Sequence, residues 1–182
     1  MKSPLKKIAS STVFVFLAII TITLVILDHD HTHNHLELGS EVDLDLEVRS
    51  YDGHAWPIKT LADNPLLLNF WAPWCPSCVH EMPLLQNFAA KYAEWLAVLG
   101  VAIDSKTEEV ATLVRAKSIR YPIAEASDAL AERFHVDQLP FTVLIQNKHV
   151  RWLHKGILTQ REFRKIEELL TVEPQSPLQT QP

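Results

Sequence analysis

The chain has 182 residues, of which 47% are hydrophobic and 21% are charged, and its formal net charge is −5. This length and composition suit one globular domain with extensions, and the chain can bury an ordinary core without structural metals or disulfides. The acidic balance and the lack of a basic patch argue against nucleic-acid binding.

Residues 8–27 predict a membrane anchor. They form an uncharged, mostly apolar run of 20 residues, and a helix of that length spans a hydrocarbon core of about 30 Å. Lysines precede the run and acidic residues follow it, so we expect residues 1–7 in the cytoplasm. A cleaved signal peptide is the alternative, but the residues before Asp28 lack a small-residue cleavage site. We therefore expect a single-pass protein of the bacterial inner membrane, with the residues after the anchor in the periplasm.

Residues 28–39 predict a polar linker. Histidines alternate with other residues from His29 to His35, a pattern that also occurs in metal-binding tracts. Alternating histidines in a flexible segment would bind metals weakly and unselectively, and no other ligand cluster supports such a site. We therefore favour the linker and predict neither a metal site nor a cofactor, while metal binding by the tract stays open.

Residues 40–171 combine strand and helix patterns. Acidic and apolar residues alternate over 41–50, which predicts a strand with one wet face. A turn signal separates it from a second short strand at 56–59. The apolar run 66–71 predicts a buried strand, and a helix is expected over 76–92.

The later elements continue this alternation. Ser105 and Glu108 have the spacing of a helix capping box, and a four-residue polar connection between two apolar runs predicts a hairpin. The expected elements are a strand at 96–103, a helix after Ser105, an extended piece at 121–124, a helix around 130–134, a hairpin of 141–145 and 150–153, and a helix capped by Thr159 and Glu162. This order predicts an α/β fold with parallel and antiparallel strands. Residues 172–182, rich in Pro, Gln and Ser, predict a disordered tail.

The only two cysteines, Cys75 and Cys78, are placed for redox chemistry. Cys75 lies where the buried strand gives way to a helix N-terminus, and the backbone N–H groups there favour a thiolate, the reactive form. Cys78 follows on the same helical face and can close a disulfide with Cys75. A zinc site needs four ligands, and a structural bridge over so small a loop stabilises little. We therefore expect Cys75 to attack and Cys78 to resolve the mixed disulfide.

The stretch 69–83, Asn-Phe-Trp-Ala-Pro-Trp-Cys-Pro-Ser-Cys-Val-His-Glu-Met-Pro, resembles the TlpA/ResA/DsbE group of membrane-anchored periplasmic thioredoxin-like proteins. The anchor, the N-terminal strand pair and an insert at about 104–134 match the group's pattern, and the resemblance covers about 40–171. It implies a thioredoxin-like fold with a central mixed sheet flanked by helices, an N-terminal strand extension and a central insert. It also implies a protein thiol-disulfide oxidoreductase. Within the group, the short insert and the plain Cys-Pro-x-Cys look most like the ScsD branch, the suppressor-of-copper-sensitivity type.

The group's pattern places a functional glutamate at Glu81. Glu81 is three residues past Cys78 and shares its helical face. A half-buried carboxylate at this position could relay protons to and from the Cys78 thiol. A surface glutamate in the first part of the helix is the alternative.

The stretch before the hairpin looks like the group's cis-proline region. The resemblance implies a cis Leu139–Pro140 bond packed against the disulfide, with the Leu139 backbone free to pair with an extended substrate segment. Of Trp71 and Trp74, which flank the site, we expect one in the core and the other at the rim beside Cys75, where it would contact substrate.

The resemblance implies protein thiol and disulfide substrates and an integral-membrane electron donor of the DsbD/ScsB type. Reduction and oxidation use the same residues, and the sequence leaves the direction open. A dedicated cytochrome c maturation reductase of the DsbE/CcmG kind is the first alternative. A peroxiredoxin-type peroxidase would need a lone peroxidatic cysteine closely preceded by a hydroxyl residue, but Ala72, Pro73 and Trp74 precede Cys75. The third alternative is a metal-binding protein that uses the histidine tract.

Overall fold

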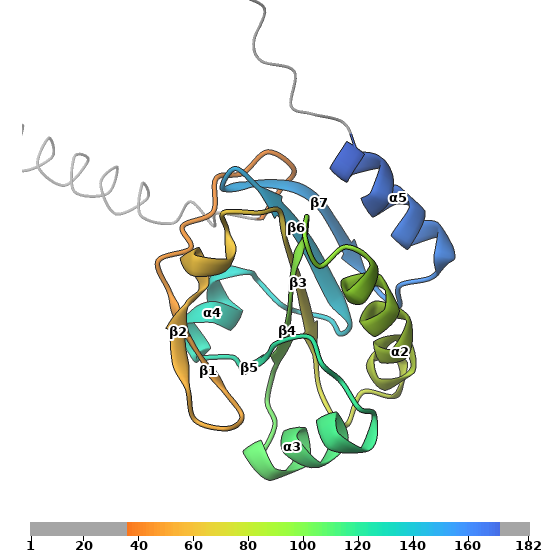
Figure 1. Cartoon of the computed structure of the whole chain (residues 1–182). Helices are drawn as coiled ribbons and strands as arrows, with labels where there is room; N and C mark the ends of the chain where they lie inside the picture. Colours follow the sequence, from red (N-terminus) through yellow and green to blue (C-terminus); the bar gives the residue numbers. More distant parts are fainter. Residues whose placement is uncertain (1–35, 172–182) are drawn as a thin grey trace, which may run out of the picture. The chain divides into compact units, whose positions relative to one another are not determined.

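A computed structural model of the chain describes residues 36–171 (Figure 1). Within this range no helix is both long enough and apolar enough to cross a bilayer. The predicted anchor at 8–27, the histidine tract and the predicted tail at 172–182 lie outside the described residues.

The described residues form one mixed sheet with the order β2-β1-β5-β4-β3-β6-β7. The central strand β3 pairs in parallel with β4 and antiparallel with β6, and β4 pairs in parallel with β5. Antiparallel pairing adds β1 and β2 at one edge and β7 at the other. The strands are β1 (Glu47–Ser50), β2 (Ala55–Pro57), β3 (Leu66–Trp71), β4 (Ala97–Ala102), β5 (Ile123–Glu125), β6 (Phe141–Gln146) and β7 (His149–Lys155).

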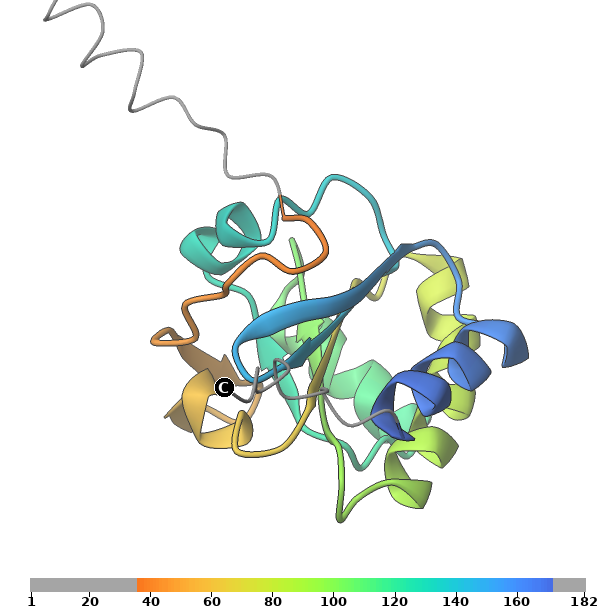
Figure 2. The same ribbon diagram turned by 90° about the horizontal axis from the view of Figure 1, so that it is seen from above.

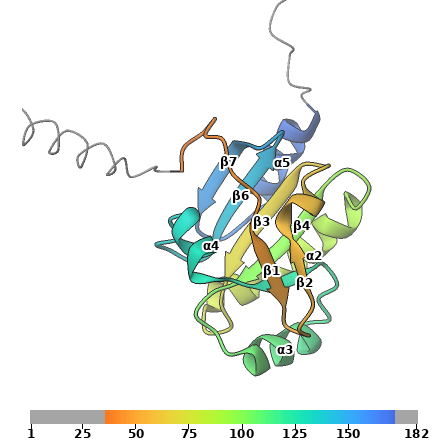
Figure 3. The same cartoon turned by 90° about the vertical axis from the view of Figure 1, so that its left-hand side faces the viewer.

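Helices cover both faces of the sheet, as the views along and across the strands show (Figures 2 and 3). One face carries α2 (Pro76–Lys91), α3 (Thr107–Ala116) and α5 (Gln160–Thr171), and the core on this side contains both cysteines. The other face carries α4 (Asp128–Arg133), a 3₁₀ helix (Ile58–Leu61) and the segment before β1. The predicted fold of a mixed sheet flanked by helices is confirmed.

Strand β3 is buried along its whole length because it has a strand on each side and helices on both faces. Its side chains alternate between the two cores, as the pleat of a strand requires. Leu67 and Trp71 point toward the face of α2, whereas Phe70 points to the opposite face, with its ring 5.2 Å from Phe134. Asn69 shares the parity of Leu67 and therefore faces α2.

The N-terminal strand is shorter than predicted. Only 47–50 of the expected 41–50 form β1, although Val42 and Leu44 are buried in the alternation that the sequence shows. The reason is that 39–42 leave the line of β1 and pair with the start of β7 instead. Three backbone hydrogen bonds make this contact: Gly39 N–H to Val150 O (2.8 Å), Val150 N–H to Ser40 O (2.9 Å) and Val42 N–H to Lys148 O (2.7 Å). The expected strand at 56–59 is likewise only partly formed, since β2 ends at Pro57 and the 3₁₀ helix follows.

Two local predictions are wrong in detail. The Ser105 hydroxyl donates to the Ile103 carbonyl (2.6 Å), so it does not cap α3, which begins at Thr107 without a side-chain cap. The hairpin turn has two residues and not four, because β6 and β7 extend up to Asn147 and Lys148. Both residues have positive φ, 53° and 62°, as in the tight turns that match the twist of paired strands.

The final helix begins as predicted. The Glu162 carboxylate accepts the Thr159 N–H at 3.0 Å, so the acidic half of a capping box is present. Helix α5 packs on α2 through the rings of Phe163 and Phe88, whose centroids are 4.8 Å apart. Because α5 and α2 form one layer, the connection that precedes α5 is held close to the cysteines.

Candidate active site

The cysteines lie where the chain passes from β3 into α2. Cys75 is the N-cap residue of α2, and Pro76 occupies the first turn, where its missing N–H would have no partner. Cys75 and Cys78 form a disulfide with an S–S distance of 2.06 Å. The Cys78 N–H donates to Cys75 Sγ at 3.3 Å. In the reduced protein this donor and the helix dipole would stabilise a thiolate on Cys75.

The two sulfurs differ in their access to solvent. Cys75 is 5% exposed and borders a groove, whereas Cys78 is completely buried. A partner sulfur can therefore reach Cys75 directly and Cys78 only after Cys75 has been engaged. This difference supports the predicted division of roles between an attacking and a resolving cysteine.

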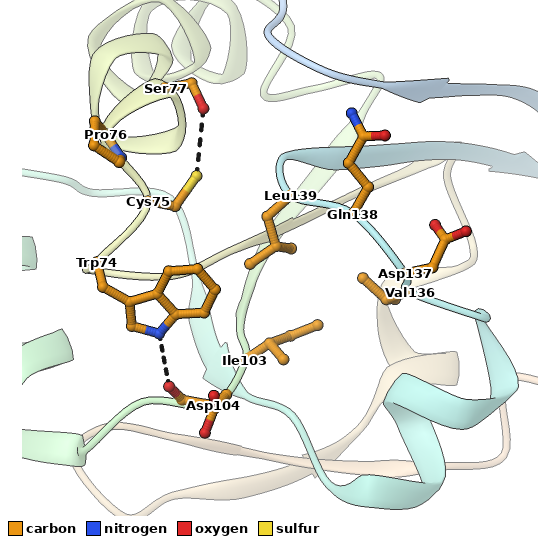
Figure 4. Close-up of a pocket in the computed structure, with 10 residues that line it drawn as sticks. All are labelled: Trp74, Cys75, Pro76, Ser77, Ile103, Asp104, Val136, Asp137, Gln138 and Leu139. Carbon is orange, nitrogen blue, oxygen red and sulfur yellow. Dashed lines mark hydrogen bonds between the residues drawn. The ribbon is translucent and has the colours of Figure 1, made fainter.

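The groove beside Cys75 has a volume of about 470 Å³ (Figure 4). It is lined by the Cys75 loop, the end of β4 and the segment before β6: Trp74, Cys75, Pro76, Ser77, Ile103, Asp104, Val136, Asp137, Gln138 and Leu139. Trp74 is 58% exposed, and its indole N–H donates to the Asp104 carbonyl at 2.9 Å, which fixes the ring as one wall. Trp71 is fully buried. The predicted split into one core and one rim tryptophan is confirmed.

The peptide bond between Leu139 and Pro140 is cis, as predicted. Leu139 lines the groove with Cys75, so the loop before β6 and the cysteine loop face the same space. Within residues 36–171 the Leu139 backbone makes no hydrogen bond, whereas the Pro140 carbonyl accepts the Gly156 N–H at 2.8 Å. The Leu139 N–H and C=O are therefore available to a bound segment.

Glu81 is completely buried, which corrects the prediction of a half-buried carboxylate. One oxygen accepts the Asn69 side-chain amide at 2.9 Å, and the other accepts the Leu158 backbone N–H at 2.6 Å. The Asn69 amide also donates to the Thr142 hydroxyl at 3.1 Å. Burial raises the pKa of Glu81 from 4.5 to about 7, although both hydrogen bonds act in the opposite direction. A carboxyl group with such a pKa can take up and release a proton near neutral pH.

Two partners of Glu81 were not expected. Asn69 is the one polar residue in the apolar run 66–71, and a buried amide needs partners, so this signal was present in the sequence. Leu158 acts through its backbone N–H from 77 positions away, and no side-chain pattern marks such a contact.

Three buried side-chain polar atoms lack partners among the described residues: Trp71 Nε1, the Tyr121 hydroxyl and Glu125 Oε1. The side chains of Trp71 and Tyr121 border Gly100, where a Cβ atom would lie 3.0 Å from the Tyr121 ring and 3.2 Å from Trp71 Nε1. Burial, and to a smaller extent the charge of Glu81, raises the pKa of Tyr121. The Tyr121 hydroxyl therefore stays protonated and without a hydrogen bond in this structure.

Replacing Tyr121 by phenylalanine is expected to raise the free energy of unfolding by about 1 kcal/mol, because it removes a buried hydroxyl that makes no hydrogen bond. Urea denaturation measures the change. The matched control is Tyr92→Phe, which removes a hydroxyl that donates to Glu167 at 2.8 Å and should lower stability by a similar amount. A loss of stability in Tyr121→Phe would mean that this hydroxyl has a partner in solution.

Within residues 36–171 no three His, Cys, Asp or Glu side chains are close enough together to hold a metal ion. The predicted site residues other than the cysteines are Trp74, Leu139, Pro140 and Glu81. Trp74 and Leu139 line the groove, while Glu81 lies in the buried layer one helical turn after Cys78.

The fold and the cysteine pair together define a thioredoxin-fold thiol-disulfide oxidoreductase. A crystal structure of a thiol:disulfide interchange protein of the thioredoxin family from Chlorobium tepidum TLS has a TM-score of 0.65 and 21% identity, and the match covers 74% of this chain and 98% of that one. The sequence profile of the AhpC/TSA family matches residues 41–153, and the chain belongs to this family.

Relatives of the chain include bacterial thiol-disulfide oxidoreductases. The thioredoxin-like protein YneN of Bacillus subtilis (strain 168) is 26% identical over 126 residues, which are 67% of this chain and 74% of YneN. ResA of Halalkalibacterium halodurans, a thiol-disulfide oxidoreductase, is 25% identical over 126 residues, which are 67% of this chain and 71% of ResA. The thiol:disulfide interchange protein DsbE of Xylella fastidiosa (strain 9a5c) is 31% identical over 104 residues, which are 56% of this chain and 52% of DsbE. The resemblance to the TlpA/ResA/DsbE group is thus confirmed.

Proposed function

We propose that the protein is anchored in the bacterial inner membrane by residues 8–27 and exchanges disulfides with periplasmic proteins through Cys75 and Cys78. The observation that carries the exchange chemistry is the groove in which Cys75 alone of the two sulfurs is accessible. The anchor and the compartment are supported by the uncharged apolar run and the lysines that precede it.

In the reducing direction, the Cys75 thiolate attacks one sulfur of a substrate disulfide. The substrate S–S bond breaks, one substrate sulfur leaves as a thiolate, and a mixed disulfide joins the other to Cys75. The Cys78 thiol then loses its proton and attacks Cys75 Sγ. This step releases the second substrate thiolate and re-forms the Cys75–Cys78 disulfide, so two electrons pass to the substrate. The reverse sequence oxidises a dithiol substrate.

Glu81 is proposed to accept the proton of the Cys78 thiol before the second step. It follows Cys78 by one turn of α2, is shielded from solvent and has a pKa of about 7. A buried thiol has no water to take its proton, so a nearby carboxylate that can be protonated at neutral pH provides the base. In the oxidising direction Glu81 returns the proton.

The substrate segment is proposed to lie in the groove in an extended conformation. The unpaired Leu139 backbone would donate and accept hydrogen bonds as a neighbouring strand does, beside Pro140. The fixed indole of Trp74 would pack against the side chains that flank the substrate cysteine. An integral-membrane donor of the DsbD/ScsB type is proposed to re-reduce the disulfide.

The test is trapping in intact cells with Cys78→Ala, which should stall the mixed disulfide at Cys75, followed by mass spectrometry of the captured proteins. Cys75→Ala is the matched control. Recovery of periplasmic thiol proteins supports the proposal and, where these proteins belong to copper stress, the ScsD-like assignment. Recovery of apocytochrome c or a haem-delivery protein alone would replace it by a dedicated cytochrome c maturation reductase. If Cys78→Ala captures nothing beyond the control, the exchange function is wrong.

A protease test in the same cells addresses the anchor. A C-terminal epitope should be digested in spheroplasts but not in intact cells, and it should sediment with membranes. Deletion of residues 1–27 should release the domain from the membrane fraction. An epitope that stays protected in spheroplasts would contradict the proposed orientation.

A further inference from the structure

The connection between β7 and α5, residues 156–158, contacts two parts of the site. One is the loop before β6 (136–140, the groove loop), and the other is the buried Glu81 carboxylate. The Gly156 N–H donates to the Pro140 carbonyl at 2.8 Å. Two residues later, the Leu158 N–H donates to Glu81 Oε2 at 2.6 Å. A span of three residues therefore links the proposed proton acceptor to the residue next to Leu139.

The C-terminal end of this connection is held in place. Leu158 is 1% exposed, so its side chain is fixed in the core. Thr159 follows at once and begins α5 through its hydrogen bond to Glu162. Helix α5 is fixed on α2 by ring packing and by Glu167, which pairs with Lys91 and accepts the Tyr92 hydroxyl. We therefore expect a change in the Leu158 contact to act on Gly156 and not on α5.

The strength of the Leu158 contact depends on the charge of Glu81. A hydrogen bond to a carboxylate is roughly twice as strong as one to a neutral group. Protonation of Glu81 therefore weakens the hold of the carboxyl group on the connection. When Glu81 is ionised, the connection is fixed at both of its hydrogen bonds.

The surroundings of Glu81 contain few other groups that change charge. Asn69 on β3 is neutral, and the pKa of Tyr121 is raised. Cys78 on α2 is in the disulfide in this structure, and it is a thiol in the reduced enzyme that binds a substrate disulfide. Glu162 on α5 is engaged with Thr159 and Arg161, and its pKa is lowered to about 2. His154 on β7 is the titratable side chain in contact with the connection itself, 3.3 Å from the Ile157 carbonyl.

We propose that residues 156–158 are a positioning segment that couples the ionisation of Glu81 to the placement of Leu139 and Pro140, and thereby to substrate affinity. The proposal rests on the proposed function, in which the Leu139 backbone pairs with the substrate. Ionised Glu81 holds the groove loop in its binding position through Leu158 and Gly156. Protonated Glu81 holds the groove loop less firmly. The KM for a protein or peptide disulfide therefore rises as the pH falls.

The first measurement is the pH dependence of KM and kcat for a fluorogenic disulfide peptide with the full-length enzyme. Leu158→Pro removes the N–H that Glu81 accepts. The wild type should show a KM about tenfold higher on the acid side of the Glu81 titration than on the basic side. The variant should keep the higher KM at every pH, while kcat retains its own pH dependence.

Two variants separate this effect from a general disturbance. Ile157→Pro is the matched control, since the Ile157 N–H makes no hydrogen bond among the described residues. His154→Gln removes the other titratable contact of the connection. Both should keep the pH dependence of KM that the wild type shows. If Leu158→Pro also keeps it, or if His154→Gln abolishes it, the coupling through Leu158 is wrong.

An NMR titration tests the coupling without substrate and with the fold intact. The amide resonances of Leu158 and Gly156 should shift with one common midpoint in the wild type, and neither should show that midpoint in Glu81→Gln. A Leu158 shift without a matching Gly156 shift would overturn the proposal. If the two amides titrate together but the enzyme reduces no disulfide peptide at any pH, the proposed function fails while the coupling itself stands.

Discussion

Replacing Cys75 by serine is expected to lower the rate of disulfide exchange by at least about 10³-fold. Cys75 provides the accessible sulfur of the pair, and the Cys78 N–H donates to it at the start of α2. A serine hydroxyl in the same place is not ionised near neutral pH and cannot form the mixed disulfide. The loss should appear in kcat/KM for a disulfide peptide and for the reduction of insulin.

The controls separate the sulfur from its surroundings. Ser77→Ala removes a hydroxyl 3.4 Å from Cys75 Sγ and should keep most of the rate. In the reduced wild type, iodoacetamide should alkylate Cys75 well before Cys78, because only Cys75 is reached from the groove. Faster labelling of Cys78, or exchange by Cys75→Ser at more than about one hundredth of the wild-type rate, would reverse the assignment of the two cysteines.

Replacing Glu81 by glutamine is expected to remove a large pH dependence of stability. Below pH 4.5 the carboxyl is protonated in the folded and the unfolded chain. As the pH rises from 4.5 through about 7, the unfolded chain ionises while the folded chain keeps its proton. The free energy of unfolding of the wild type should therefore fall over this window, by about 3 kcal/mol in total. In Glu81→Gln this decline should be absent.

Urea denaturation of the oxidised protein across this window gives the measurement. Glu162→Gln is the control, because the pKa of Glu162 is lowered to about 2, mainly by the Thr159 hydroxyl. Its stabilising effect is present above pH 4.5 and is lost as the pH falls toward 2, outside the window of Glu81. Glu162→Gln should therefore keep the wild-type decline between 4.5 and 7. A Glu81→Gln variant that still declined like the wild type would mean that Glu81 ionises normally in the folded protein.

The parts of the fold that the sequence predicted are those determined by neighbouring residues. The apolar run 66–71 is strand β3, the cysteine loop starts α2, and Thr159 and Glu162 begin α5. The order of strands and helices predicted the mixed sheet. Local pattern was insufficient where a competing contact decided the structure. Ser105 bonds back to Ile103, and 39–42 pair with β7, which is distant in the chain.

The same distinction applies to the site. Cys75 and Cys78 follow from a short motif, and the resemblance to the TlpA/ResA/DsbE group implied the cis bond before Pro140. The structure contains both the disulfide and the cis bond. The burial of Glu81 does not follow from a short motif, because it depends on Asn69 and Leu158, which lie 12 and 77 positions away. A position three residues past Cys78 fixes the helical face but not what covers that face. The raised pKa of the carboxyl group is therefore a property of the fold and not of the motif.

The attachment of 39–42 to β7 also has a mechanical consequence. A force applied at residue 36, as a tether would apply it, acts first on the three hydrogen bonds to Lys148 and Val150. Bonds that open one after another resist a pull less than a sheet loaded in parallel, so this segment should peel away before β1 is disturbed. Each released residue adds up to about 3.5 Å of reach. An optical-trap record should contain this as a small extension before global unfolding, and Cys75 would meanwhile keep its groove. The first residues of the domain would then extend under load while the rest of the enzyme stays folded.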